Sequence, residues 1–327
     1  MTRVLSGIQP TGDVHLGNYL GAIRRWVEFQ DLYESCFYCV VDLHALTLPQ
    51  DPAELRASTL QTATVLLAAG LDPDACTLFV QGHVPQHTEL TWLLECTATF
   101  GEVSRMTQFK EKSEGQESVR VGLFTYPVLQ AADILLYDTD QVPVGDDQRQ
   151  HLELCRDLAI RFNHHYGTVF TVPEAAIPTV AARVMDLQDP RAKMSKSLSS
   201  PQGKIDLLED PASIIRKIKR AVTDTGNEVT YDPDGKPGVS NLLELLAVAT
   251  GSTPRELAGR YTQYGPLKSD TAEAIVEYLR PVQERYRALE GDPGYVHDVL
   301  AKGATKAEAV ASVTLARARE AIGLLPR

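Results

Sequence analysis

The sequence of 327 residues contains no apolar run of the roughly 18 residues that a membrane-spanning helix needs. Its start, Met1-Thr2-Arg3 leading into a short strand-like run, also lacks the charged, apolar and small-residue regions of a signal peptide. We therefore expect a soluble, cytoplasmic protein that has no membrane partner.

Cysteine is scarce, and the five cysteines are an odd number at scattered spacings, which argues against a disulfide framework. Cys36 and Cys39 have the spacing of a metal pair. They lie, however, in the strand-like run 35–41, where residues three apart point to opposite faces. The sequence therefore favours reduced thiols and indicates no protein ligand for a metal.

The chain lacks an excess of positive charge, since 32 basic residues face 43 acidic residues and the formal net charge is −11. This charge gives no indication of a protein that holds nucleic acid by bulk electrostatics. It does not exclude a local basic face that binds and releases RNA, so the net charge leaves an RNA partner open.

The first half of the chain alternates short apolar runs with helical patterns. The runs and patterns lie, in chain order, at 3–7, 17–30, 36–42, 52–70 and 76–80. Asp51 is a natural N-cap, Pro52 fits the first helical turn, and Gly70 suits the C-terminal end of the same helix. Strands that alternate with helices predict an α/β fold with a Rossmann-like parallel sheet.

Strand signals disappear after residue 201, and the remaining chain has only helical patterns. These patterns lie at 210–222, 240–250, 253–263 and 269–289, with two more across 294–323. We therefore predict a Rossmann-like catalytic domain at 1–203 and a C-terminal α-helical domain at 204–327.

The loop after the first strand, residues 6–18, opens the first helix. Free backbone N–H groups and the helix dipole favour an anion at such a position. Gly17 lets a flat base approach the backbone, and His15 and Asn18 share a face from which both can donate to phosphate. The alternative is a glycine-containing turn in which these residues only cap the helix.

Two further loops carry groups suited to a nucleotide. In the polar segment 191–200, Lys193 and Lys196 are three apart and several hydroxyls surround them, as neutralising a departing pyrophosphate would require. In 142–148, a carboxylate at a strand end, either Asp146 or Asp147, can accept from a ribose hydroxyl. The alternatives are a solvated loop and a helix N-cap made by Asp146 or Asp147.

Three polar residues, Tyr126, Gln130 and Asp133, stand at i, i+4 and i+7 of an otherwise apolar helix, which we expect to start at Pro127. Burying such groups is costly, so they reach solvent or meet a polar ligand. An indole ring offers one N–H donor, and a buried carboxylate satisfies it well.

The segments His15-Leu16-Gly17-Asn18 and Lys193-Met194-Ser195-Lys196-Ser197 resemble the HIGH and KMSKS signatures of class I aminoacyl-tRNA synthetases, with Asn18 in place of the final histidine. Runs at 37–45, 101–112, 145–148 and 236–243 are similar to those of the bacterial tryptophanyl-tRNA synthetases. The resemblance implies activation of L-tryptophan with ATP, transfer to tRNA(Trp), Mg²⁺ held through the ATP phosphates, an anticodon-binding helical domain and a homodimer.

The same resemblance implies site residues. The catalytic residues are His15, Asn18, Lys112, Lys193 and Lys196. The ATP-binding residues are Gln9, Pro10, Thr11, Gly17, Asn18, Gly145, Asp146, Asp147, Val184, Lys193, Met194, Ser195, Lys196 and Ser197. The tryptophan-binding residues are Leu5, Gln9, His44, Gln108, Tyr126, Gln130, Asp133 and Gln148, with Asp133 as the indole acceptor.

Gln130 departs from the resemblance, because methionine commonly lines the indole pocket at this position. A tyrosine-specific relative therefore stays open as an alternative. A small-molecule nucleotidyltransferase and a synthetase-like paralogue that acts as partner of another enzyme are the other readings. The intact lysines of 193–197 and the helical second half favour a charging enzyme over both.

Lys196 generates the first testable prediction. Replacing it in Lys196→Ala removes a charge that would stabilise the departing pyrophosphate, and we expect activation to slow by roughly a hundred- to a thousandfold. Tryptophan binding should change little. ATP–pyrophosphate exchange and equilibrium binding measure the two effects, and near-normal exchange would contradict the assigned role.

Overall fold

The computed structural model describes residues 2–113, 118–143, 145, 148–176, 184–195 and 200–326. In these residues a five-stranded parallel sheet has the order β3-β2-β1-β4-β5. Its strands are β1 (Arg3–Ile8), β2 (Ser35–Val40), β3 (Thr77–Val80), β4 (Gln141–Pro143) and β5 (Glu174–Ala176). The predicted Rossmann-like α/β fold is thereby confirmed.

The strand order reverses at β1, which pairs with β2 on one side and with β4 on the other. Leu5 lies opposite Phe37 of β2, and Val4 lies opposite Gln141 of β4. The chain leaves β1 and β4 in different directions, and ligands of such sheets bind in the crevice at this point. A ligand-binding site is therefore expected at the loops after β1 and β4.

Helices cover both faces of the sheet. The helical elements of the first part are α1 (Leu16–Asn18), the π-helical η1 (Tyr19–Ile23), α2 (Arg24–Leu32), α3 (Asp42–Ala45), α4 (Pro52–Ala69), the 3₁₀ turn η2 (Gln81–His83), α5 (Gln86–Glu95), α6 (Phe100–Val103), α7 (Thr107–Ser113), α8 (Val121–Leu135) and α9 (Arg149–Tyr166). The later ones are α10 (Pro211–Lys219), α11 (Pro237–Thr250), α12 (Pro254–Ala258), α13 (Tyr264–Glu290) and α14 (Pro293–Ile322). None of the described helices is long and apolar enough to cross a membrane.

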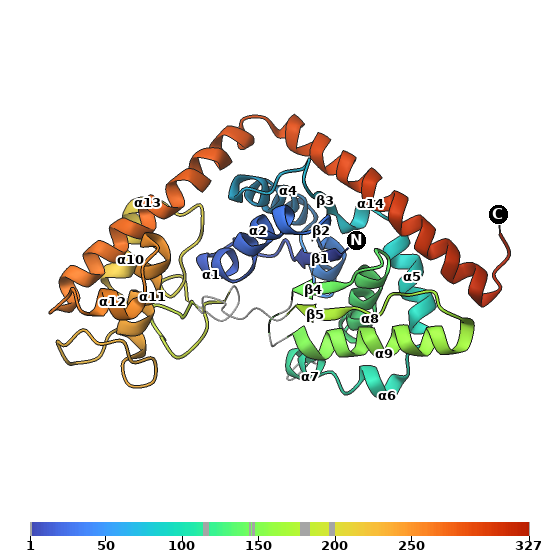
Figure 1. The fold of residues 1–327 in the computed structure, drawn as a ribbon, viewed down its shortest axis with the longest axis horizontal. Helices are drawn as coiled ribbons and strands as arrows, with labels where there is room; N and C mark the ends of the chain where they lie inside the picture. The colour runs from blue at the N-terminus through green and yellow to red at the C-terminus, as the bar shows by residue number, and fades with distance from the viewer. Residues whose placement is uncertain are drawn as a thin grey trace.

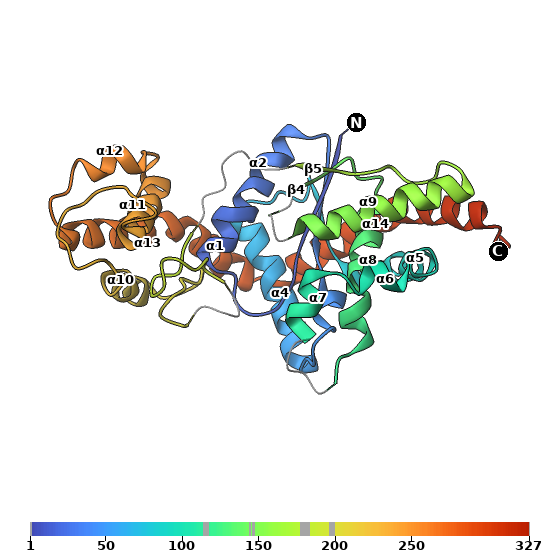
Figure 2. The same cartoon turned by 90° about the horizontal axis from the view of Figure 1, so that it is seen from below.

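Alternation along β2 divides the hydrophobic core in two. Cys36 and Tyr38 point to the side covered by α2 and α4, whereas Phe37 and Cys39 point to the side covered by α5, α8 and α9. Figure 2 shows the sheet between these two layers. Cys36 and Cys39 thus lie on opposite faces, as the strand pattern predicted.

Local signals set the ends of α4 as expected. The Asp51 carboxylate accepts from the backbone N–H groups of Ala53 and Glu54 at 2.8 and 3.0 Å, and Pro52 occupies the first turn. Gly70 ends the helix with a φ of 116°, a conformation that residues with a Cβ rarely adopt.

The predicted start of the helix at Pro127 is wrong. α8 begins at Val121, and Pro127 lies inside it. A proline in a helix interior removes one backbone hydrogen bond. The helix nevertheless continues because residues on both sides of Pro127, including Leu123 and Val128, are buried in the core, and tertiary packing supplies most helical stability.

The two helices predicted across 294–323 are also wrong, because α14 is one helix of 30 residues. Gly303 does not interrupt it. A Cβ at this glycine would lie 1.8 Å from the Leu78 carbonyl oxygen, so the missing side chain lets the helix approach β3 closely. The predicted helix at 253–263 is shorter than expected and ends at Ala258.

Figure 1 shows α10–α12 gathered at one end of the molecule, away from the sheet, with α13 leading back toward it. α14 then runs beside β3 and α5. The proposed domain division at residue 203 stays a prediction, but the last helix of the second segment packs against the first.

The close approach at Gly303 generates a stability prediction. Gly303→Ala forces α14 away from β3, and we expect the free energy of unfolding to fall by about 2–3 kcal/mol. Gly265→Ala is the matched control, because this glycine also lies in a helix but nothing lies within 4 Å of its added Cβ. Urea unfolding compares the two, and equal effects would show that α14 does not depend on the contact.

Candidate active site

A cavity of about 470 Å³ lies at the carboxyl ends of β1 and β4, where the strand order reverses. All eight residues predicted to bind tryptophan line it, namely Leu5, Gln9, His44, Gln108, Tyr126, Gln130, Asp133 and Gln148. Gly145, predicted to bind ATP, lines it too. The structure therefore brings these residues together from β1, α3, α7, α8 and the chain before α9.

Asp133 lies at the base of this cavity and is only 4% exposed. Its Oδ2 accepts from His44 Nε2 at 2.8 Å, and its Oδ1 accepts from Gln81 Nε2 at 2.7 Å and His87 Nδ1 at 2.6 Å. Burial favours the neutral carboxyl, but the hydrogen bonds from His44 and His87 outweigh burial and hold the pKa of Asp133 well below its usual value. Asp133 is therefore an ionised acceptor inside an otherwise largely apolar wall.

Neutral polar groups also line the cavity. The Tyr126 hydroxyl donates to Gln108 Oε1 at 3.2 Å and lies 2.9 Å from His151 Nε2. Gln130 Nε2 donates to Gln148 Oε1 at 3.3 Å. These contacts fix side chains that would otherwise rotate, so the cavity presents ordered donors and acceptors.

His15 and Asn18 form a reciprocal cap at the start of α1. His15 Nδ1 accepts from the Asn18 backbone N–H, and Asn18 Oδ1 accepts from the His15 backbone N–H, both at 3.3 Å. A neutral His15 whose Nδ1 accepts must carry its proton on Nε2. The capping role and the predicted phosphate contact are thus compatible, because the cap orients Nε2 as a donor.

The lysine-containing loop lies against this turn. A Cβ at Gly17 would be 3.0 Å from the His15 ring and 3.5 Å from Met194 Cβ. Met194 is buried, and its N–H donates to the Val184 carbonyl at 3.0 Å, while the exposed Lys193 pairs with Met185. The loops at 15–18 and 193–195 therefore meet at Gly17.

Backbone pairing holds this meeting point. The Leu16 N–H donates to the Ile205 carbonyl at 2.8 Å, and the Leu207 N–H donates to the Val14 carbonyl at 2.9 Å. The segment after the lysine loop thus adds an antiparallel partner to the turn that carries His15.

Several residues predicted to bind ATP do not line the main cavity, and others are not among the residues that the structure describes. Pro10 is buried and Thr11 half-buried in the turn before His15, and Ser195 is half-buried. Asp146, Asp147, Lys196 and Ser197, together with the Lys112 side chain, lie outside the described residues, so their roles stay predictions.

Comparison with known families identifies the chain. The family described as tRNA synthetases class I (W and Y) matches residues 1–280. The chain belongs to this family. Tryptophan–tRNA ligase 1 of Streptomyces coelicolor is 56% identical over 330 residues, which cover 100% of this chain and 98% of that relative. The tryptophan–tRNA ligase of Caldanaerobacter subterraneus is 53% identical over 100% of both chains.

Solved synthetases have the same fold. Tryptophanyl-tRNA synthetase from Mycoplasma pneumoniae superposes with a TM-score of 0.92 at 36% identity, covering 99% of this chain and 98% of that one. The synthetase from Campylobacter jejuni, complexed with ADP and tryptophan, gives a TM-score of 0.86 at 36% identity and covers 99% of this chain and 100% of that one.

The synthetase has functional-site neighbours that sequence reasoning missed, namely Gln81, His87, Tyr137 and His151. Gln81 and His87 follow β3, whose carboxyl end was predictable. Nothing in the sequence, however, shows that this end and the last turn of α8 meet below the cavity. The available signal was His87 within α5, and a single buried histidine in a helix is usually a core residue.

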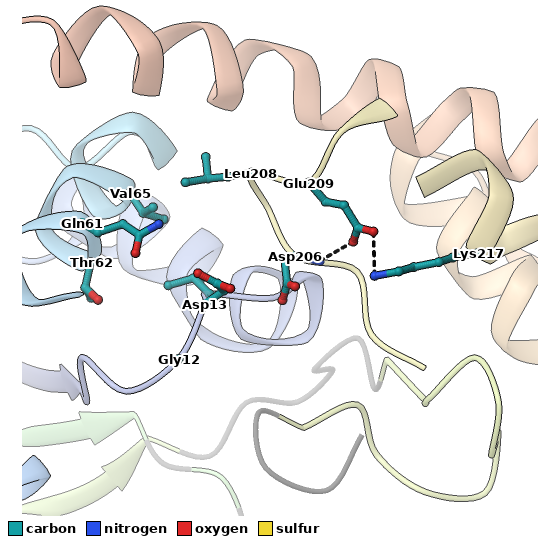
Figure 3. Close-up of a pocket in the computed structure, with 10 residues that line it drawn as sticks. Gly12, Asp13, Gln61, Thr62, Val65, Asp206, Leu208, Glu209 and Lys217 are labelled. Carbon is teal, nitrogen blue, oxygen red and sulfur yellow. Dashed lines mark hydrogen bonds and ion pairs between the residues drawn. The ribbon is translucent and has the colours of Figure 1, made fainter. Parts of the chain in front are cut away.

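A second, smaller cavity of about 300 Å³ lies beside the His15 turn of the synthetase, between α4 and 206–209 (Figure 3). Here Glu209 Oε1 forms an ion pair of 2.6 Å with the buried Lys217 of α10, and Glu209 Oε2 accepts from the Asp206 backbone N–H. Lys217 also donates to the Lys204 carbonyl at 2.9 Å. Lys217 therefore ties both ends of the segment that pairs with the His15 turn to α10.

Removing Lys217 should destabilise the synthetase, because Glu209 would lose its cationic partner while half enclosed. We expect Lys217→Met to lower the free energy of unfolding by about 3 kcal/mol. Lys219→Met on the same helix is the control, since Lys219 is exposed and its loss should change stability by no more than about 0.5 kcal/mol. Urea unfolding of both variants measures the difference, and indistinguishable midpoints would refute an anchoring role for Lys217.

Proposed function

We propose that this synthetase is a tryptophan–tRNA ligase. It activates L-tryptophan with ATP to tryptophanyl adenylate and pyrophosphate, and then transfers tryptophan to tRNA(Trp). The single observation that carries the proposal is the buried Asp133 carboxylate, which accepts from three side chains and lines the cavity shared by all eight predicted tryptophan-binding residues. The full-length likeness to tryptophan–tRNA ligases supports it.

Tryptophan binds in the cavity lined by Asp133. The indole N–H is a donor with no acceptor on the same ring, and a buried carboxylate is a matched partner. Tyr126 and Gln9 contact the amino and carboxylate groups, while Leu5, His44, Gln108, Gln130 and Gln148 surround the substrate. This assignment is supported by the common cavity of all eight residues.

ATP binds where the His15 turn meets the lysine loop. His15 and Asn18 hold phosphate oxygens, Gly17 admits the base, and Asp147 accepts from the ribose 2′-hydroxyl. The ATP-contacting set further includes Gln9, Pro10, Thr11, Gly145, Asp146, Val184, Lys193, Met194, Ser195, Lys196 and Ser197. The contact between Met194 and Gly17 supports a shared ATP site for the two loops.

The reaction needs no protein nucleophile. The tryptophan carboxylate attacks the α-phosphorus, and the bond to pyrophosphate breaks. A terminal ribose hydroxyl of the tRNA then attacks the adenylate carbonyl, the bond between acyl group and phosphate breaks, and AMP leaves. Lys112, Lys193 and Lys196 stabilise the charge that develops on the leaving pyrophosphate. Mg²⁺ would be held through the ATP phosphates and would neutralise part of their charge, because this ion rarely uses an all-protein cage.

The RNA partner contacts the helical segment 204–327, which the proposal assigns to anticodon binding. Its basic residues include Arg216, Lys217, Lys219, Arg220, Arg280, Arg285 and Arg287, of which Lys217 is buried in the ion pair with Glu209. We also propose a homodimer in the cytoplasm. The exposed Trp92 of α5 and Phe100 of α6 supply apolar surface for a second subunit.

Tyrosine is the second candidate substrate, because Gln130 and Gln148 add an amide pair to the cavity wall. A phenol hydroxyl can both donate and accept, whereas an indole N–H only donates. Asp133, with its three protein donors, can accept from either ring, so the full-length likeness to tryptophan–tRNA ligases is what favours tryptophan.

The deciding measurement is ATP–pyrophosphate exchange with tryptophan and with tyrosine. We expect tryptophan to be preferred by at least about a hundredfold in kcat/KM. Asp133→Asn should reduce kcat/KM for tryptophan by roughly ten- to a hundredfold, since a hydrogen bond to a charged acceptor is lost. Aminoacylation of total tRNA with labelled tryptophan identifies the charged RNA. Preference for tyrosine, or exchange without charging of tRNA(Trp), would overturn the proposal.

A further inference from the structure

We propose that His87 and Tyr137 are positioning residues that make Asp133 selective for an aromatic ring bearing an N–H donor. The inference rests on the proposed activation of tryptophan and deepens it. Neither residue has to touch the substrate for this role, because both act through the orientation and hydrogen bonding of the Asp133 carboxylate.

The two oxygens of Asp133 differ in how they are occupied. A carboxylate oxygen offers about two acceptor positions. Gln81 and His87 take both positions on Oδ1, at 2.7 and 2.6 Å. In the part of the chain that the structure describes, His44 alone donates to Oδ2, at 2.8 Å. A ligand donor in the cavity is therefore directed to the second position on Oδ2.

The donors on Oδ1 are themselves held in one orientation. The Gln81 Oε1 accepts from the Leu43 N–H at 3.2 Å, which turns its amide nitrogen toward Asp133. His87 Nε2 lies 2.8 Å from the Tyr137 hydroxyl. When His87 is neutral, its Nδ1–H donates to the ionised Asp133, so its Nε2 must accept from Tyr137.

The hydrogen bonds from Tyr137 to His87 and from His87 to Asp133 form a relay, and burial keeps it in place. His87 and Tyr137 are both 0% exposed, and the Tyr137 ring stacks on Phe37 at 4.6 Å between ring centroids. Burial, together with the negative charge of nearby Asp133, raises the pKa of Tyr137, so its hydroxyl stays protonated and able to donate. The chain Tyr137–His87–Asp133 thus has one consistent set of donors and acceptors.

The relay matters because an empty acceptor position on Oδ1 would weaken the selectivity of Asp133 for a ring that bears an N–H donor. Without the His87 donor, Asp133 turns or admits water to satisfy Oδ1, and the alignment of Oδ2 with the ring N–H is lost. The carboxyl also loses one of the hydrogen bonds that hold its pKa low, and a neutral carboxyl is a weaker acceptor. The predicted consequence is a loss of discrimination, not a loss of the chemical step.

The test compares tryptophan with 3-(benzothiophen-3-yl)alanine, in which sulfur replaces the ring N–H at nearly the same shape. Selectivity is the ratio of the two kcat/KM values in ATP–pyrophosphate exchange by the full-length enzyme. We expect the unmodified enzyme to prefer tryptophan by at least about a hundredfold. His87→Leu should lower this ratio at least about tenfold, mainly through a higher KM for tryptophan with kcat nearly unchanged.

Two further variants separate positioning from packing. Tyr137→Phe removes only the hydroxyl, and we expect the ratio to fall roughly three- to tenfold. His87→Asn places an amide N–H near the position of Nδ1, restoring the donor to Asp133, so the ratio should return to within about threefold of the original. A residue that served only as packing would not be rescued in this way.

Tyr38→Phe is the matched control for Tyr137→Phe. Tyr38 is also 0% exposed, and its hydroxyl donates to the Trp26 carbonyl at 2.8 Å, outside the Asp133 network. Both variants lose one buried hydroxyl hydrogen bond and should lose similar thermal stability. Only Tyr137→Phe should change the ratio.

Each outcome decides one claim. If the unmodified enzyme fails to discriminate, the proposed reading of the indole N–H by Asp133 fails. If it discriminates and both His87→Leu and Tyr137→Phe keep the ratio, the relay is refuted while the proposed function stands. Should His87→Leu fail to fold, the comparison of Tyr137→Phe with Tyr38→Phe decides, and equal ratios in that pair refute the relay.

Discussion

The antiparallel backbone pairing between 14–16 and 205–207 is the constraint on which the site depends. Two short hydrogen bonds join the turn after β1 to the segment that follows the lysine loop. This pairing places Met194 against Gly17, far from it in sequence. The two loops meet because these backbone groups satisfy each other's hydrogen bonds.

The second constraint is the charge buried under the cavity. An ionised carboxylate loses much of its hydration when buried, and it is tolerated only when donors replace the water. Asp133 meets this condition with donors from three different elements, α3, η2 and α5. The packing of α5 and α8 on the sheet is therefore also what keeps a polar acceptor available at the base of an apolar wall.

The prediction of helices and strands relied on local propensity, and this explains both where it was correct and where it was wrong. Local propensity determines the alternation of strands and helices and the ends of α4 at Asp51, Pro52 and Gly70. The α/β sheet predicted from this pattern is the one observed. Pro127 and Gly303 follow local propensity poorly. Each lies inside a long helix because the neighbouring core or β3 compensates for the unfavourable residue, and such compensation comes from distant parts of the chain.

The sequence by itself determined the fold class, the family and the residue types of the site, because motifs and periodicity are local properties. It placed Asp133, Tyr126 and Gln130 on one helix face, and the cavity contains all three. Only the tertiary structure decided that Gln81 and His87 hold the carboxylate, that Tyr137 holds His87, and that Lys217 anchors the segment beside His15. Hydrogen bonds between remote elements depend on how the helices pack on the sheet, and the spacing of residues along the chain does not predict that packing.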